Sequence, residues 1–331
     1  MNRLRKISTV LLLAIIILPL MGCADPAAAK KLADAGSKFG TSLKDYYSSL
    51  ESDLVDIWEA EAFISSIRSK TGDDDLFLDA SQQLMQSQID AIEHRMQLAH
   101  QIESAYSAMQ QLSSYDASAE IGDAAKKLST EIKALPILPK SKIDPSDIFG
   151  SLAGELAAWK QSRDLKRGSE LILKTLNATK LLFERETEAY KSIATERGQK
   201  MADIVETLIT SKLVVSWAIL NAAPKTLDLT WANPKKPIED NRLQKAVIQL
   251  AKVRLKRLSM LSASAADDID DALSKLIKSH NDFEKSNSLS ITDALAAIQK
   301  VQSYVDQIAK LRAEIRDDKK KITADQGADE K

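Results

Sequence analysis

The residue types that most often carry chemistry are scarce in this chain of 331 residues. It has three histidines, His94, His100 and His280, and a single cysteine, Cys23. No His-Glu-x-x-His pair occurs, and no glutamate stands three places before a histidine, so neither a zinc-hydrolase nor a di-iron pattern is supported. Since His280 lies in an apolar stripe, we expect it to be a core histidine with satisfied ring nitrogens.

Other catalytic signatures are also absent from the sequence. It contains no Gly-x-Ser-x-Gly elbow, no phosphate-binding Gly-x-x-x-x-Gly-Lys-Ser/Thr loop and no Gly-x-Gly-x-x-Gly turn. The acidic clusters at 73–75 and 267–271 lack the spacing of a calcium loop, so we interpret them as helix N-terminal caps. The sequence therefore predicts no enzyme activity, no cofactor, no metal and no evident small-molecule ligand.

The N-terminal segment has the three zones of a secretory signal. Arg3, Arg5 and Lys6 supply positive charge, and the stretch 10–18 is apolar without interruption. This run is too short to span a bilayer, which requires roughly 20 apolar residues, and Pro19 breaks its end. A charged start, a short apolar core and a small residue before the cut site together predict a signal peptide over residues 1–22.

The segment Leu20-Met21-Gly22-Cys23 resembles the lipobox of bacterial lipoproteins. Leu20, Gly22 and Cys23 match the family pattern, while Met21 departs from its usual small or β-branched residue. The resemblance covers about the first 25 residues and implies cleavage between Gly22 and Cys23, followed by acylation, as with palmitate, at Cys23. Since Cys23 is the only cysteine, no intrachain disulfide can compete for its thiol.

The same resemblance implies a location. Family sorting depends on the residue after the cysteine, which here is Ala24, with Asp25 one place later. In a Gram-negative cell, Ala24 favours the outer membrane, facing the periplasm. In other bacteria the lipid would hold the chain on the outer face of the cell membrane. Multiple acyl chains give the durable membrane anchoring that one chain does not.

Composition predicts helices and argues against a nucleic-acid partner. Aromatic residues are 5% of the chain, charged residues are 28%, and glycine and proline number 10 and 8. Removal of residues 1–22 takes away three positive charges and moves the net charge from −1 to −4. This profile is typical of helical proteins, and no basic excess marks a nucleic-acid binder.

Prolines divide the mature chain into blocks, because proline is excluded from helix interiors. We expect Pro-rich connections near 136–146 and 224–238, and a helix start at Asp144-Pro145. Gly168 and Gly198 are candidate helix breaks or bends, and Gly150 with Gly154 has the small-xxx-small spacing of close helix approach. The domain prediction is a tether over 23–38, a helical body over 39–316 with sub-blocks 39–135, 146–223 and 238–316, and a disordered charged tail over 317–331.

Apolar residues recur at three- and four-residue spacings within each block, as in coiled-coil-like antiparallel helices. The sequence therefore predicts an elongated all-α multi-helix bundle. Representative stripes are Leu43, Tyr47, Leu50, Leu54 and Ile57; Met85, Ile89, Ile92, Met96, Ala99, Ile102, Tyr106 and Met109; Ile121, Ala125, Leu128, Ile132 and Leu135; and Ile269, Leu273, Leu276, His280 and Phe283.

Of three function classes that remain open from the sequence, an enzyme with a carboxylate-based site has no motif to support it, and two others are favoured over it. The first is a lipid-anchored scaffold of the cell envelope that binds an unidentified protein partner, with Trp231 in the 224–238 loop as a contact. The second is a membrane-active, pore-forming-like helical protein that uses the segment 207–223. Lys212 is the only charge in that segment, which is either a core helix or an element that inserts into a membrane.

Overall fold

The described part of the chain is built from helices alone, which confirms the predicted all-α bundle. In the computed structural model the residues described are 26–68, 75–112, 118–159, 165–210, 241–285 and 291–327. The helices are α2 (Pro26–Arg68), α3 (Asp75–Leu112), α4 (Ser118–Ala134), α5 (Pro145–Phe149), α6 (Leu152–Trp159), α7 (Leu165–Thr210), α9 (Asn241–Glu284) and α10 (Ile291–Gly327).

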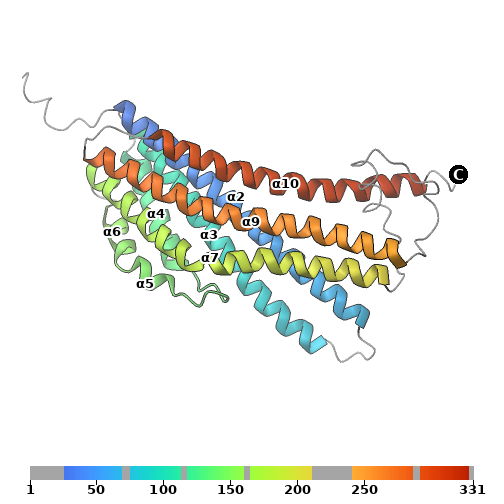
Figure 1. The fold of residues 1–331 in the computed structure, drawn as a ribbon. Coiled ribbons are helices and arrows are strands. Elements are labelled where there is room, and N and C mark those ends of the chain that lie inside the picture. Colours follow the sequence, from blue (N-terminus) through green and yellow to red (C-terminus); the bar gives the residue numbers. More distant parts are fainter. Residues whose placement is uncertain are drawn as a thin grey trace, which may run out of the picture.

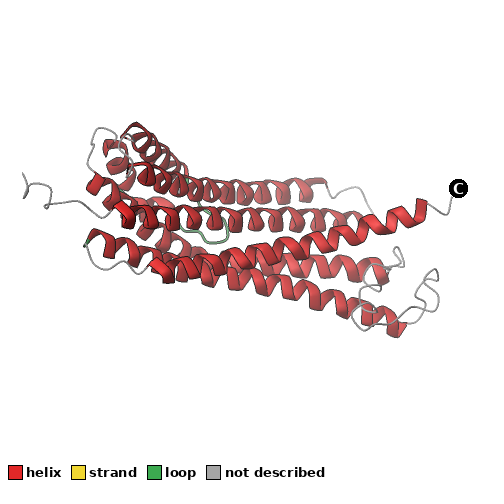
Figure 2. Ribbon diagram, turned by 90° about the horizontal axis from the view of Figure 1, so that it is seen from above, coloured by secondary structure: helices red, strands yellow, loops and turns green. Residues whose placement is uncertain are grey.

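The long helices run up and down along one axis, so that helices adjacent in sequence are antiparallel (Figures 1 and 2). At one end, here called the proximal end, the start of α2 lies beside the start of α10 (Figure 1). Further along the same two helices, Ser42 Oγ donates to Gln302 Oε1 at 3.0 Å. At the opposite, distal end, Lys252 near the start of α9 pairs with Glu206 near the end of α7 at 2.7 Å. The short helices α4, α5 and α6 cover α3 and α7 toward the proximal end.

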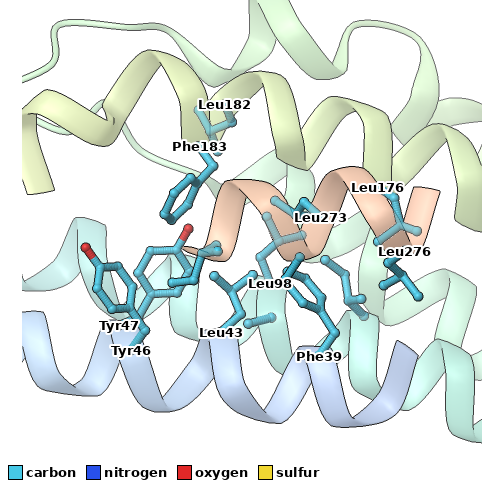
Figure 3. Close-up of a cluster of buried hydrophobic side chains, with 14 of the residues drawn as sticks. Phe39, Leu43, Tyr46, Tyr47, Leu98, Leu176, Leu182, Phe183, Leu273 and Leu276 are labelled. Carbon is cyan, nitrogen blue, oxygen red and sulfur yellow. The ribbon is translucent and has the colours of Figure 1, made fainter. Parts of the chain in front are cut away.

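One hydrophobic core joins the three predicted sub-blocks. Helix α2 contacts α3, α7, α9 and α10, so its apolar face is buried on several sides. Figure 3 shows Phe183 of α7 directed toward Tyr46 and Tyr47 of α2, with Leu273 of α9 nearby. The three Pro-bounded sub-blocks are therefore parts of one packed body, because buried residues from all three belong to the same hydrophobic cluster.

The body begins earlier than the sequence indicated. Residues 26–38 were expected to be part of a tether, but α2 begins at Pro26 and its side chains Leu32, Ala33 and Ala35 are fully buried. The Ala-rich composition that suggested a tether instead permits close packing. A Cβ on Gly36 would overlap the buried Tyr106 ring, and a Cβ on Gly40 would lie 2.8 Å from the backbone nitrogen of Glu103.

The C-terminal segment also differs from expectation. The charged stretch 317–331 was predicted to be disordered, whereas α10 continues as a helix to Gly327. Its sequence places Asp317 and Lys321 four residues apart, a spacing at which opposite charges stabilise a helix. A segment poor in large apolar residues can therefore still have a helical backbone.

The predicted glycine roles are mostly wrong. Helix α7 is continuous from Leu165 to Thr210 through both Gly168 and Gly198. At Gly198 the missing side chain makes room for Ser259 of α9, whose hydroxyl donates to Ala194 O at 2.9 Å. A Cβ on Gly150 or Gly154 would contact nothing within 4 Å, so this small-residue pair mediates no close approach.

The first Pro-rich connection lies where the sequence placed it. Helix α4 ends at Ala134, and Asp144 then caps α5 by accepting a hydrogen bond from Ser146 N at 2.8 Å. Hydrogen bonds from the Ser146 side chain and from its backbone N–H lower the pKa of the Asp144 carboxyl, because they stabilise the charged form. The second connection, 224–238, lies outside the described residues.

Candidate functional site

The predicted site residues Gly22, Cys23 and Trp231 all lie outside the described residues. The structure does describe the helix that follows Cys23 in the sequence. Helix α2 begins at Pro26, three residues after Cys23, and its first turns are packed at the proximal end. A lipid on Cys23 would thus be attached almost directly to the folded bundle, without a long flexible spacer.

The apolar segment 207–223 is described only at its beginning. Residues 207–210 form the last turn of α7, where Ile209 is buried, and residues 211–223 lie outside the described part. The two described residues that flank the gap, Thr210 and Asn241, are both at the distal end. The segment is therefore joined to the bundle at the end opposite the start of α2.

A buried ion pair joins α3 to α7 in the middle of the bundle. The guanidinium of Arg95 binds both carboxylate oxygens of Glu186, with Nε donating to Oε2 at 2.7 Å, and both side chains are fully buried. The remaining Arg95 donors bind the carbonyls of Ala91 at 2.6 Å and Pro136 at 3.2 Å. Tyr190 OH donates to Glu186 Oε2 at 2.5 Å. This two-pronged geometry satisfies both charges without water.

Aromatic rings pack beside this ion pair. Tyr46, Tyr47, Phe183 and Tyr190 have centroid separations between 5.3 and 6.5 Å, mostly tilted or edge-on. Burial raises the pKa of Tyr190 and Tyr47 above the usual tyrosine value. For Arg95, burial alone would lower the pKa, but the hydrogen bonds to Glu186 raise it overall, so the guanidinium stays charged. Its role is to fix the packing of α3 against α7.

Sequence reasoning missed this pair, although a signal was present. Arg95 stands three residues after Ile92 and four before Ala99, on the apolar stripe of α3. Glu186 stands four residues before Tyr190, on the apolar stripe of α7. Opposite charges at stripe positions of two helices indicate a buried pair, but only tertiary structure shows that the two helices meet there.

The prediction for His280 is confirmed, since it is a buried histidine with satisfied ring nitrogens. Tyr106 OH lies 2.9 Å from Nδ1 and Ser169 Oγ lies 2.8 Å from Nε2, so the cluster joins α3, α7 and α9 at the proximal end. Glu284 Oε1 is 3.8 Å from Nε2, beyond hydrogen-bond distance. A serine beside a histidine resembles a nucleophile–base pair, but Ser169 is 4% exposed and His280 is fully buried. Its chemistry here is structural.

The structure predicts that His280 makes stability fall in mild acid. Burial lowers the pKa of His280 from 6.5 to about 4. Since the folded state favours the neutral ring, its stabilising effect is complete above the unfolded pKa and is lost as pH falls from 6.5 toward 4. The loss should total about 3 kcal/mol, at about 1.4 kcal/mol per pKa unit. Urea unfolding at a series of pH values measures it.

His280→Gln is the matched variant for this measurement, because an amide keeps polar atoms in the cluster but does not titrate. The variant will be less stable at neutral pH, yet its stability should fall less between pH 6.5 and 4 than that of the parent. Parallel pH profiles for the two proteins would show that His280 does not carry the effect. Carboxylates that titrate in this range are common to both proteins and cancel in the comparison.

The acidic cluster 267–271 is not a helix cap, contrary to expectation, because it lies inside α9. Each aspartate is paired with a lysine. Lys191 binds Asp267 at 2.8 Å and Lys300 binds Asp268 at 2.6 Å, while Asp270 and Asp271 bind Lys180 and Lys275 at 3.3 and 2.7 Å. The cluster therefore joins α9 to α7 and α10 along its solvent-facing edges. The cluster at 73–75 falls outside the described side chains.

Polar and charged residues form most of the lining of the hollows found among the described residues. One follows α7 and is lined by charged residues that already have partners, including Lys191, Glu196 and Lys200. Among the described residues, no group of three or more His, Cys, Asp or Glu side chains is arranged to hold a metal ion. Within the same residues, no helix is sufficiently long and apolar to cross a membrane.

Comparisons with known proteins add no assignment. Neither a protein-family model, nor a curated protein, nor a solved structure matches the chain. Function must therefore be argued from the residues and their arrangement.

Proposed function

We propose that the chain is a lipid-anchored helical scaffold of the cell envelope that binds a protein partner. The observation that carries the proposal is the lipobox ending at Cys23, followed three residues later by α2. The 43 residues of α2 extend about 65 Å at 1.5 Å per residue. A lipid at the proximal end would thus hold an elongated body whose distal end reaches away from the attachment point.

The interior of the bundle supports a scaffolding role. Glu186 binds Arg95 and Tyr190, and His280 binds Tyr106 and Ser169, so each cluster ties buried polar groups of different helices together. Such hydrogen-bonded clusters favour a single arrangement of the helices. A rigid body with one fixed end is suited to present a surface at a set distance from a membrane.

The anchor is tested by Cys23→Ser in the full-length precursor. Without the thiol no thioether can form, so the variant should take up no radiolabelled or clickable fatty acid and should accumulate uncut. The parent should be labelled and shortened by residues 1–22, measured by mass spectrometry of the intact protein. Labelling of the Cys23→Ser variant would place the lipid elsewhere and refute the anchor.

The partner is tested by cross-linking in cells with the lipidated full chain. A photoreactive residue replaces Trp231 in one strain and the exposed Lys126 of α4 in a control strain. We expect a discrete adduct at position 231 that is absent at position 126 and is identified by mass spectrometry. Failure to recover a specific adduct at position 231, or at exposed positions scanned along the distal end, would contradict the scaffold proposal.

A second candidate, membrane insertion by 207–223, is favoured by one observation. The described residues flanking this apolar segment, Thr210 and Asn241, lie at the end of the bundle that points away from Cys23. An inserting element at that end would meet a lipid surface other than the one at the anchor. Dye release from liposomes by residues 24–331, abolished by Val214→Asp, would support it. Liposomes that retain their dye in the presence of the protein would refute membrane insertion by 207–223.

A further inference from the structure

The first half of α9 is strongly basic. From Asn241 to Ala266 the sequence has six basic residues and no acidic residue, whereas four aspartates follow within 267–271. The aspartates are neutralised by lysines of α7, α9 and α10, as described above. Among the basic residues of the first half, Lys252 pairs with Glu206, while neither Lys256 nor Arg257 forms an ion pair with another described residue. Among the described residues, the positive charge of Lys256 and Arg257 is therefore not balanced by an ion pair.

These charges share a face with exposed apolar side chains. Val253 and Met260 are 64% and 61% exposed. They stand seven residues apart, which places them on one face of α9. Lys256 and Arg257 lie between them and are also exposed. We call this surface the α9 stripe. It comprises Lys245, Gln249, Val253, Lys256, Arg257 and Met260.

The opposite face of α9 explains why the stripe is not core. Val247, Ala251, Leu255 and Leu258 are buried against the bundle, so the helix already has its packing partners. The stripe spans 16 residues, from Lys245 to Met260, or about 24 Å of helix. Exposed methionine and valine between cationic side chains are typical of surfaces that lie in a lipid headgroup layer.

We propose that the α9 stripe binds the anionic headgroup surface of a phospholipid membrane. Lys256 and Arg257, with Lys245 about three turns away, would contact lipid phosphates. Val253 and Met260 would enter the boundary between headgroups and acyl chains. Each basic residue near such a surface raises the affinity about five-fold. A second copy of the chain fits less well, because pairing stripe to stripe would bring like charges together.

The test uses residues 24–331, which contain every described helix and lack the acylated cysteine. Cosedimentation with vesicles of phosphatidylcholine, with and without phosphatidylglycerol, measures binding. We expect binding to the anionic vesicles, little to the neutral ones, and loss at high salt. Lys256→Glu combined with Arg257→Glu should weaken it by about 30-fold or more, since two favourable contacts are removed.

A matched control keeps the same change in net charge. Lys126 and Lys127 are exposed on α4, so Lys126→Glu with Lys127→Glu should bind anionic vesicles as the parent does. Circular dichroism checks that both double variants remain helical. Equal loss in the two variants, equal binding to neutral and anionic vesicles, or unchanged binding after reversal of the stripe would each overturn the proposal. So would stripe-dependent dimers in sedimentation velocity without vesicle binding.

This proposal stands independently of the anchor, because the protein tested lacks Cys23. Val253→Ser with Met260→Ser tests its apolar half. The side chains are exposed, so folding should be unaffected, while binding to anionic vesicles should weaken several-fold. Unchanged affinity in this variant would contradict contact of these side chains with the membrane.

Discussion

Arg95→Ala is expected to destabilise the bundle by about 3–5 kcal/mol, since it leaves the carboxylate of Glu186 buried without its partner. Both side chains are fully buried, and Arg95 also satisfies the carbonyls of Ala91 and Pro136. The guanidinium thus links α3 both to α7 and to the Pro-rich connection after α4. Urea unfolding followed by circular dichroism measures the loss, and Glu186→Ala should produce one of similar size.

An exposed pair provides the control. Lys300 binds Asp268 at 2.6 Å on the surface, with the lysine 58% exposed, so Lys300→Ala should cost less than about 1 kcal/mol. Replacing both members of the buried pair, as in Arg95→Met with Glu186→Leu, should recover much of the stability lost in either single variant. A loss below about 1 kcal/mol in Arg95→Ala would show that the buried pair does not hold α3 against α7.

Alanine at Gly36 or Gly40 is expected to destabilise the protein, although alanine favours helices. The added Cβ would meet the buried Tyr106 ring at position 36, and at position 40 it would lie 2.9 Å from Glu103 Cα. Overpacking of this kind costs about 1–3 kcal/mol, which exceeds the gain of up to about 1 kcal/mol in helix propensity. Tyr106 cannot move freely, because its hydroxyl is bonded to His280.

Gly154→Ala is the matched control, and its expected effect on stability has the opposite sign. Gly154 lies in α6, and a Cβ there would contact nothing within 4 Å. Helix propensity should therefore raise stability by up to about 1 kcal/mol. Thermal unfolding of the three variants gives the comparison. Stabilisation by Gly36→Ala or Gly40→Ala would contradict the close approach of α2 to α3.

Periodicity predicted the helices well, because burial of one helix face repeats about every 3.6 residues whatever the partner. Each predicted stripe lies on a helix of the structure, and one representative side chain from each is buried: Leu43, Ile92, Leu128 and Leu273. Prediction failed where composition replaced periodicity. Alanines before residue 39 suggested a tether, and the aspartates at 267–271 suggested a helix cap. Both segments instead lie within long helices, because composition does not reveal which other helix packs against a segment.

The sequence by itself determined what depends on local order along the chain: the all-α class and the break at Asp144-Pro145. Only the tertiary structure decided which stripes meet. It paired Arg95 with Glu186, 91 residues away, and placed His280 between side chains of two other helices. In the tertiary structure the α9 stripe is also exposed, whereas aspartates of the same helix form ion pairs with lysines of α7 and α10. Such choices depend on contacts between distant segments, which spacing within one helix does not encode.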